Sequence, residues 1–251
     1  MIKVLELFSG TGSVKKCCDK LGWDCVSVDI ESKYNPTHCI SIMDFDYKKY
    51  NNFDIIWGSP PCVEYSNLKS CWLGKKLKDG SIYTKEVQEK LMKDADLLVS
   101  KTFEIINYFQ PYLWFVENPQ TSRLKDRKIM KDIPYYDFDY CMYSDWGYRK
   151  RTRVWTNKKD FEPLTCDNSG SCGNMLEILT DGAVRHDSGK PLKCDTRKLH
   201  NTNCGKSETL RAIRKHSISS DGGKKNGKGT RREDRYRIPE ELIFNLFLAT
   251  S

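Results

Sequence analysis

One cysteine could act as a nucleophile in the stretch WGSPPCVEYS, residues 57–66, where it follows two prolines and the apolar run FDIIW. A thiol in such a loop can be a buried structural side chain, a metal ligand or a nucleophile. Pro60 and Pro61 remove backbone donors and stiffen the loop, which would hold Cys62 in place without a regular helix. Burial is the usual fate of a free cysteine, so other residues must show whether Cys62 takes part in chemistry.

Two further polar groups occupy positions that suit a reaction site. Glu117-Asn118-Pro119 follows the apolar run YLWFV, and Arg151 and Arg153 lie within RKRTRVW. The carboxyl group can hold or transfer a proton, and a guanidinium can orient a planar polar substrate or fix the carboxylate. Each group alone would more often be a surface charge, whereas the three together, after successive strands, describe a site.

A glycine turn, Phe8-Ser9-Gly10-Thr11-Gly12, ends the first apolar run. Its glycines allow a tight turn and a close approach of the backbone to a ligand at a helix N-terminus. Lys15 replaces the third glycine of a dinucleotide fingerprint, so the turn suits a nucleoside without a pyrophosphate. Asp29, with Glu31 close behind, could accept hydrogen bonds from a ribose diol. A glycine turn alone is weak evidence, since many such turns exist for geometric reasons.

Alternating strand and helix patterns must position these groups. We expect strands at residues 3–8, 24–30, 37–42, 53–59 and 112–119, helices at 13–22 and 84–109, and antiparallel strands at 136–147 and 149–157. This order predicts a mostly parallel sheet, in which Cys62, Glu117 and the glycine turn share the carboxyl edge where ligands bind. The apolar stripe of the long helix should pack on the sheet. Its expected members are Val87, Leu91, Ala95, Leu98 and Ile105.

The amino-acid composition changes near residue 160. Residues 160–234 are rich in Gly, Ser, Asn, Asp and Lys and read as a small irregular lobe. Pro239 suits the first turn of a last helix that docks back on the main domain. We therefore expect three parts, residues 1–159, 160–234 and 235–251.

Composition narrows the class of protein. The chain has 251 residues, enough for one α/β domain with a small lobe, and no apolar run long enough to cross a bilayer. Its N-terminus lacks a secretory pattern, so we expect an intracellular protein with no membrane partner. Eleven cysteines, an odd number at irregular spacing, favour thiols over a disulfide framework. Residues 205–238 hold eleven Lys/Arg against four Asp/Glu, which suits either a phosphate-contacting face or solvated loops.

The motifs LELFSGTGS, GSPPCVEYS, FVENP and DWGYRKRTRVW together resemble the cytosine-5 DNA methyltransferases, which use S-adenosylmethionine. The resemblance covers about residues 1–157 and the final helix, and its specific part is the cysteine loop followed by the Glu-Asn pair. It implies an α/β, Rossmann-like methyltransferase fold with helices on both faces of the sheet and a small irregular target-recognition lobe. It also implies double-stranded DNA as the partner, and we expect a monomer.

The resemblance also implies roles for single residues. The Cys62 thiolate would add to C6 of a flipped cytosine, Glu117 would bind N3 and the exocyclic amine, Arg153 would hold O2 and Arg151 would support the loop. Ser66 would contact a phosphate, and residues 68–85 would form a mobile loop that closes over DNA. Implied cofactor contacts are Phe8, Ser9, Gly10, Gly12, Asp29, Ile30, Asp44 and Pro60. Expected phosphate contacts in the basic region are Arg211, Arg214, Lys215, Lys224, Lys225 and Lys228.

Three departures from the family pattern leave the reacting groups in place. Pro119 stands where Val usually follows Glu-Asn, Tyr148-Arg149-Lys150 replaces the usual Pro-Gln pair before the arginines, and the last helix lacks the usual Asn-Val pair. Ser41 occupies the position expected to carry an adenine-binding acid, with Asp44 three residues further on.

The lobe also holds side chains that could bind zinc. These are Cys166, Cys172, His186, Cys194, His200 and Cys204. Five residues separate Cys166 from Cys172, more than the two to four typical of structural zinc, so we expect thiols and no metal.

Three rival functions stay open from the sequence. Amino-methyltransferases carry a [DNS]PP motif that Ser59-Pro60-Pro61 would match, but theirs ends in an aromatic residue where this chain has Cys62. A transfer RNA cytosine-5 methyltransferase of the same fold would look alike. An inactive nucleic-acid-binding module is disfavoured because Cys62, Glu117 and Arg153 are all present.

Overall fold

A seven-stranded sheet forms the centre of the structure, a computed structural model. It describes residues 1–77, 79–146, 149–167, 172 and 236–248, with the backbone of two further strands, β8 (Met175–Leu179) and β9 (Arg211–Arg214). Among these residues no helix has the length and apolar content needed to span a membrane.

The strand order is β3-β2-β1-β4-β5-β7-β6. The strands are β1 (Lys3–Leu7), β2 (Asp24–Asp29), β3 (His38–Cys39), β4 (Ile55–Gly58), β5 (Leu113–Pro119), β6 (Tyr135–Asp139) and β7 (Arg151–Thr156). All pairings from β3 to β5 are parallel, and β7 runs antiparallel to both β5 and β6. The prediction of a mostly parallel sheet is confirmed.

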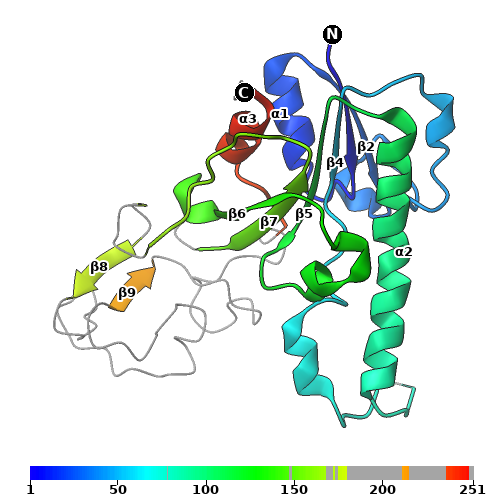
Figure 1. Ribbon diagram of the computed structural model, residues 1–251, viewed down its shortest axis with the longest axis vertical. Coiled ribbons are helices and arrows are strands. Elements are labelled where there is room, and N and C mark those ends of the chain that lie inside the picture. Colours follow the sequence, from blue (N-terminus) through cyan, green and yellow to red (C-terminus); the bar gives the residue numbers. More distant parts are fainter. Residues whose placement is uncertain are drawn as a thin grey trace.

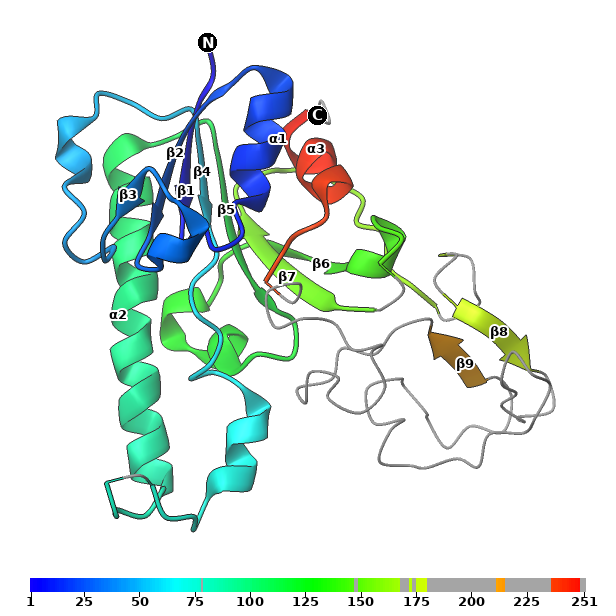
Figure 2. The same cartoon turned by 180° about the vertical axis from the view of Figure 1, so that it is seen from behind.

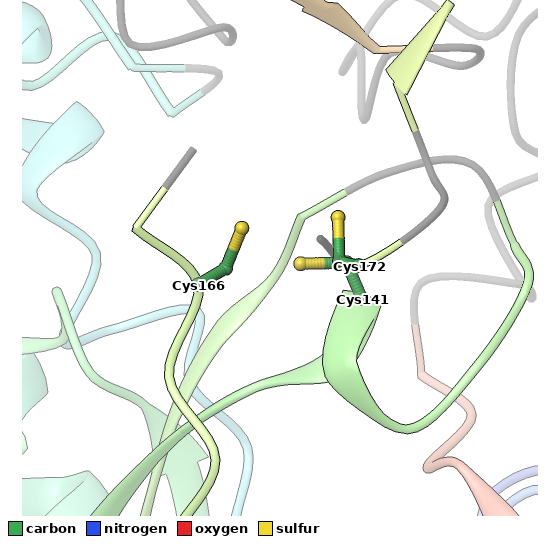
Figure 3. Close-up of side chains that lie close together, drawn as sticks. All are labelled: Cys141, Cys166 and Cys172. Carbon is green, nitrogen blue, oxygen red and sulfur yellow. The ribbon is translucent and has the colours of Figure 1, made fainter. Parts of the chain in front are cut away.

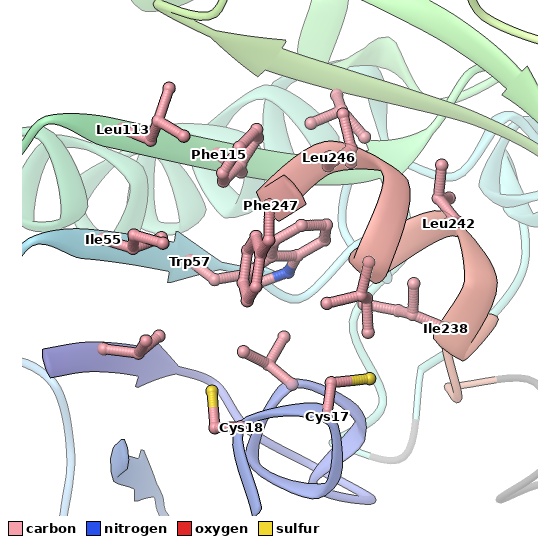
Figure 4. Close-up of a cluster of buried hydrophobic side chains, with 14 of the residues drawn as sticks. Cys17, Cys18, Ile55, Trp57, Leu113, Phe115, Ile238, Leu242, Leu246 and Phe247 are labelled. Atoms are coloured by element: carbon pink, nitrogen blue, oxygen red, sulfur yellow. The ribbon is translucent and has the colours of Figure 1, made fainter. Parts of the chain in front are cut away.

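Helices cover both faces of the sheet, as predicted. Figure 1 and Figure 2 show α1 (Ser13–Leu21) and α3 (Glu240–Leu248) on one face and α2 (Lys85–Phe109) on the other. The last helix does dock back on the domain: the Phe247 ring lies 6.2 Å from Trp57 and 5.8 Å from Phe115, centroid to centroid (Figure 4). The carbonyl of Pro239 accepts the hydrogen bond from the Ile243 amide that opens this helix.

The buried face of α2 differs from the predicted one. Val87, Leu91 and Leu98 are only partly buried. The buried stripe contains Gln88, Met92, Ala95, Val99, Thr102, Ile105 and Ile106. One close contact on this side is at Gly58 of β4, where a Cβ atom would lie only 2.9 Å from Thr102 Cγ2, so the glycine lets the Thr102 side of the helix settle against the strand. Leu98, although only partly buried, still packs against the core, as predicted.

Two expected strands are shorter than predicted. The strand at 37–42 is reduced to β3, and Ile42 packs in the core beyond it. The strand at 136–147 ends at Asp139, because a 3-10 turn, η6 (Tyr140–Met142), follows and is closed by the Tyr143 amide bonding to the Tyr140 carbonyl. Most of the predicted lobe, residues 160–234, lies outside the described residues, so the three-part division stays a prediction.

Candidate active site

The glycine turn lies at the carboxyl edge of the sheet, between β1 and α1. Phe8, Gly10 and Gly12 all have positive φ angles, of 57°, 46° and 67°. The Gly10 amide donates to Asp29 Oδ2 at 2.7 Å, and Oδ1 of the same carboxylate accepts from the Glu31 amide at 2.8 Å. The turn is therefore tied to the end of β2, as a nucleoside site at this edge would require.

The surroundings of the turn suit an amphiphilic ligand. Ile30 is 68% exposed beside the Asp29 carboxylate, although it follows a buried strand. Asp44 is exposed in the loop after β3, and the buried Ser9 donates its amide to the Val28 carbonyl. An exposed apolar side chain, a carboxylate and a glycine backbone thus share one rim, and these groups match the base, the ribose and the polar tail of a nucleoside cofactor.

A buried carboxyl group, which the sequence reading missed, supports the turn from below. Glu6 of β1 accepts hydrogen bonds from the Val14 and Lys15 amides at 3.0 and 3.1 Å, at the N-terminus of α1. Burial raises the pKa of Glu6 to about 7, although both backbone donors act to lower it. The signal that could have revealed it is an acid inside the apolar run KVLEL.

The Cys62 loop is fixed to two strands of the sheet. The Ser59 amide donates to the Leu7 carbonyl of β1 at 3.1 Å, and the side-chain amide of Asn118 donates to the Pro60 carbonyl at 2.8 Å. Cys62 itself is half-buried, and its carbonyl accepts from the Tyr65 amide at 3.2 Å. The thiol is therefore held at the sheet edge while part of its surface stays accessible.

A second anchor joins this loop to α2. The fully buried Tyr65 donates its hydroxyl to Asp96 Oδ1 at 2.9 Å, and Arg127 binds the same carboxylate at 2.6 Å. Burial and the Asp96 carboxylate raise the pKa of Tyr65, so the hydroxyl stays a donor. Nothing in the sequence pattern indicated this anchor.

Glu117 lies at the end of β5 and is 6% exposed. The Tyr140 hydroxyl donates to its Oε1 at 3.2 Å, and Lys150 Nζ lies 3.7 Å from the same oxygen. Lys150 also lies 4.6 Å from the centre of the Tyr140 ring. The carboxylate is thus oriented by a hydroxyl and a cation that the sequence reading did not assign, and Lys150 belonged to a segment noted only as a departure from the family.

Arg153 pairs with another acid and lies on the other face of the sheet from Glu117. Arg153 makes two hydrogen bonds to Asp137, at 2.7 and 2.8 Å, and stacks 3.5 Å from the Tyr135 ring centre. In the β5–β7 ladder Arg153 is opposite Asn118, while Glu117 is opposite Val154, so the Glu117 and Arg153 side chains leave opposite faces of the sheet. This arrangement does not bring Glu117 and Arg153 together.

Arg151 is exposed, with its Nε 3.9 Å from Asp139 Oδ1. Ser66 Oγ accepts from the Leu68 amide at 3.3 Å and caps a 3-10 turn, η3 (Asn67–Trp72). In the loop at 68–85, Lys76 and Ile82 form an antiparallel bridge.

The predicted phosphate contacts of the basic region are not placed as side chains. Arg211 and Arg214 lie on β9, which is described by its backbone alone, and Lys215, Lys224, Lys225 and Lys228 lie outside the described residues.

The carboxyl edge therefore combines a nucleoside-type turn, a half-buried thiol and an oriented carboxylate. A thiol nucleophile and an acid on the same edge of a sheet can act on one substrate, the thiol by forming and breaking a covalent bond and the acid by binding.

Comparison with known proteins finds one relative whose sequence aligns with nearly the whole chain. A frog virus 3 (isolate Goorha) protein, "Probable DNA (cytosine-5)-methyltransferase", is 37% identical over 250 residues, which are 98% of each chain. No family model matches.

Solved structures give weaker matches. An Entamoeba histolytica methyltransferase, EhMeth, has a TM-score of 0.46 and 15% identity, with 98% of this chain and 97% of that one covered. The S. pombe Dnmt2 methyltransferase has a TM-score of 0.36 and 16% identity. The match covers 67% of this chain and 52% of the Dnmt2 chain, about half of its length. The assignment of a family therefore rests on the sequence relative.

Proposed function

Because the chain belongs to the DNA (cytosine-5)-methyltransferase family, we propose that it methylates C5 of cytosine in double-stranded DNA through a covalent bond to Cys62. The observation that supports this most is the hydrogen bond from Asn118 to Pro60, which joins the strand of the acid to the loop of the thiol. Glu117 and Cys62 are the neighbours of these two groups in the chain.

S-adenosylmethionine is the proposed cofactor, and the residues of the glycine turn fit it. The Asp29 carboxylate would accept from the ribose, and exposed Ile30 would cover the adenine, with Asp44 near its amino group. Gly10 and Gly12 leave backbone amides and no side chain beside the polar tail. When bound, the cofactor supplies an electrophilic methyl group.

The proposed reaction starts with the Cys62 thiolate. Its sulfur forms a bond to C6 of the ring, and the displaced π electrons move through C5 and C4 to N3, giving an enamine. The Glu117 carboxyl would donate a proton to N3, and its other oxygen would accept from the exocyclic amine. C5 then takes the methyl group. A water molecule then takes the C5 proton, whose electron pair re-forms the C5–C6 double bond as the C6–sulfur bond breaks and Cys62 leaves as a thiolate.

The proposed reaction also needs contacts that hold the DNA and the target base. A cytosine inside a duplex cannot meet Cys62, so the base must be flipped out of the stack. In this proposal Ser66 and the basic segment contact phosphates and Arg151 supports the loop. The contact to O2 implied for Arg153 is not part of the proposal, because its side chain leaves the face of the sheet opposite to Glu117 and pairs with Asp137.

The test measures transfer of labelled methyl groups from S-adenosylmethionine to duplex DNA and, separately, to transfer RNA, followed by digestion to nucleosides. We expect label in 5-methylcytosine from DNA, and none with Cys62→Ala. Cys39→Ser is the matched control, because Cys39 is exposed on β3 and serine keeps a donor for the Ile30 carbonyl that the Cys39 thiol contacts at 3.7 Å.

Two results would contradict the proposal. Label in N4-methylcytosine, retained in Cys62→Ala, would indicate amino-group methylation. Label in transfer RNA alone would assign the enzyme to RNA.

A further inference from the structure

Three cysteines from two segments of the chain come close together, one of them next to Tyr140, the residue that contacts Glu117. Cys141 lies in η6, Cys166 lies in the chain beyond β7, and Cys172 follows six residues later. Their sulfur atoms all lie within 4.8 Å of one another. Figure 3 shows the three side chains directed towards a common space.

The surroundings distinguish these thiols from the cysteines of the core. Cys17, Cys18 and Cys25 belong to the apolar cluster under α3, as Figure 4 shows for the first two. Cys141 and Cys166 are just as buried, at 1% and 4% exposure, yet neither is a member of an apolar cluster. Packing in a hydrophobic core therefore does not account for their burial.

The backbone that carries the cysteines is held by polar contacts. Asp139 accepts from the Cys166 amide at 2.8 Å and pairs with Arg149 at 2.6 and 2.7 Å. The Leu164 amide donates to the Tyr143 hydroxyl at 2.8 Å. The chain at 164–166 is thus fixed against the turn that carries Cys141 before any ligand binds.

We propose that Cys141, Cys166 and Cys172 bind a structural zinc ion. Tetrahedral zinc with zinc–sulfur bonds of about 2.3 Å sets its sulfur atoms about 3.8 Å apart, so no pair of sulfurs needs to approach by more than about 1 Å. Each thiol gives up its proton as its sulfur coordinates the ion. A disulfide would use two of the three sulfurs and leave the third unexplained.

The position of the site gives it a role. Cys141 belongs to the β6 side of the catalytic domain, whereas Cys166 and Cys172 lie where the chain enters the predicted recognition lobe. Zinc would clamp the start of the lobe to the domain that carries Glu117. A pocket of about 750 Å³, lined in part by Cys141 and Cys172, provides an entry path for the ion.

The structure assigns three ligands. The sequence predicted no metal because the spacing between Cys166 and Cys172 is unusual for zinc. That prediction did not consider Cys141, which lies far from both in the sequence.

The test is the zinc content of the untagged, full-length protein, measured by mass spectrometry after expression with added zinc and extensive dialysis. We expect about one zinc per chain in the wild type, a loss of at least about tenfold in Cys172→Ser, and no change in Cys39→Ser. Cys172 is chosen because it is only half-buried, so its replacement leaves the core intact.

Cobalt provides a second measurement that does not depend on activity. Wild type reloaded with Co²⁺ should show a sulfur-to-cobalt charge-transfer band and intense visible bands of a tetrahedral site, both lost in Cys172→Ser and in Cys166→Ser. Wild type without zinc and without these bands, or equal zinc in wild type and Cys172→Ser, would overturn the proposal. Neither the zinc content nor the cobalt spectrum measures methyl transfer. A negative result for the zinc site therefore does not contradict the proposed methylation reaction.

Discussion

The side-chain amide of Asn118 donates a hydrogen bond of 2.8 Å to the carbonyl oxygen of Pro60, although 58 residues separate them in the chain. Asn118 follows Glu117 on β5, and Pro60 lies two residues before Cys62. Asn118 is 1% exposed, so water does not compete for this bond. One buried hydrogen bond thus helps to set the position of the nucleophile relative to the acid.

Replacing Asn118 with Ala should reduce both turnover and stability. Loss of a buried donor costs about 1–3 kcal/mol in the free energy of unfolding, and displacement of the Cys62 loop by about 1 Å should lower kcat on the order of a hundredfold. Steady-state methylation of duplex DNA and urea unfolding measure the two effects.

Asn157→Ala is the matched control for that variant. Its side chain bonds to the Trp114 amide and the Tyr112 carbonyl at the opposite end of β5. It should lose stability but keep kcat. Equal kcat in Asn118→Ala and wild type would show that the bond to Pro60 does not position the thiol.

Tyr140→Phe should lower kcat by about tenfold, because a hydrogen bond to a carboxylate is worth about 1.5 kcal/mol and Glu117 would lose one orienting donor. Tyr136→Phe serves for comparison, since Tyr136 lies on β6 and its hydroxyl donates to the Lys158 carbonyl, beyond the end of β7. Equal losses of kcat in the two variants would point to a general loss of packing, and the role assigned to Tyr140 would be wrong.

Asp29→Ala should weaken the binding of S-adenosylmethionine by about ten- to a hundredfold, since a charged hydrogen bond of about 1.5–3 kcal/mol is lost together with the tie to Gly10. Isothermal titration calorimetry gives the Kd directly. Asp24→Ala, at the exposed start of the same strand, should bind as wild type does. Unchanged affinity in Asp29→Ala would place the cofactor elsewhere.

Glu6 should make stability depend on pH. Its pKa is raised from 4.5 to about 7 by burial, so the folded state binds the proton more tightly than the unfolded chain. The stabilisation is fully present below about pH 4.5 and is lost as the pH rises through about 7.

Urea unfolding across this pH range, with wild type and Glu6→Gln, measures the Glu6 contribution. The variant should have a flatter dependence of unfolding free energy on pH than wild type, and Glu31→Gln, an exposed acid, should match wild type. Parallel curves for wild type and Glu6→Gln would contradict the raised pKa.

The sequence predicted those features that depend on local pattern. The glycine turn and Asp29 were found from residue types at strand ends, and the sheet followed from alternating strands and helices. The predicted apolar stripe of α2 was wrong for Val87 and Leu91, which are only partly buried, and it missed Thr102, whose contact with Gly58 joins two elements. Helical periodicity carries no information about such a contact.

The partners of Glu117 were also beyond sequence reasoning. Tyr140 and Lys150 reach the carboxylate only after β6 and β7 have paired, and their spacing from Glu117 forms no motif. The same holds for Cys141, which joins Cys166 and Cys172 through the turn after β6.

The most direct test of the central claim uses duplex DNA that contains 5-fluorocytosine, incubated with labelled S-adenosylmethionine and resolved on a denaturing gel. Fluorine cannot leave C5 as a proton does, so turnover should trap the protein on the DNA. We predict a labelled adduct that survives denaturation in wild type and Cys39→Ser and is absent in Cys62→Ala. Methylation of ordinary DNA with no trapped adduct, or an adduct that persists in Cys62→Ala, would contradict covalent catalysis by Cys62.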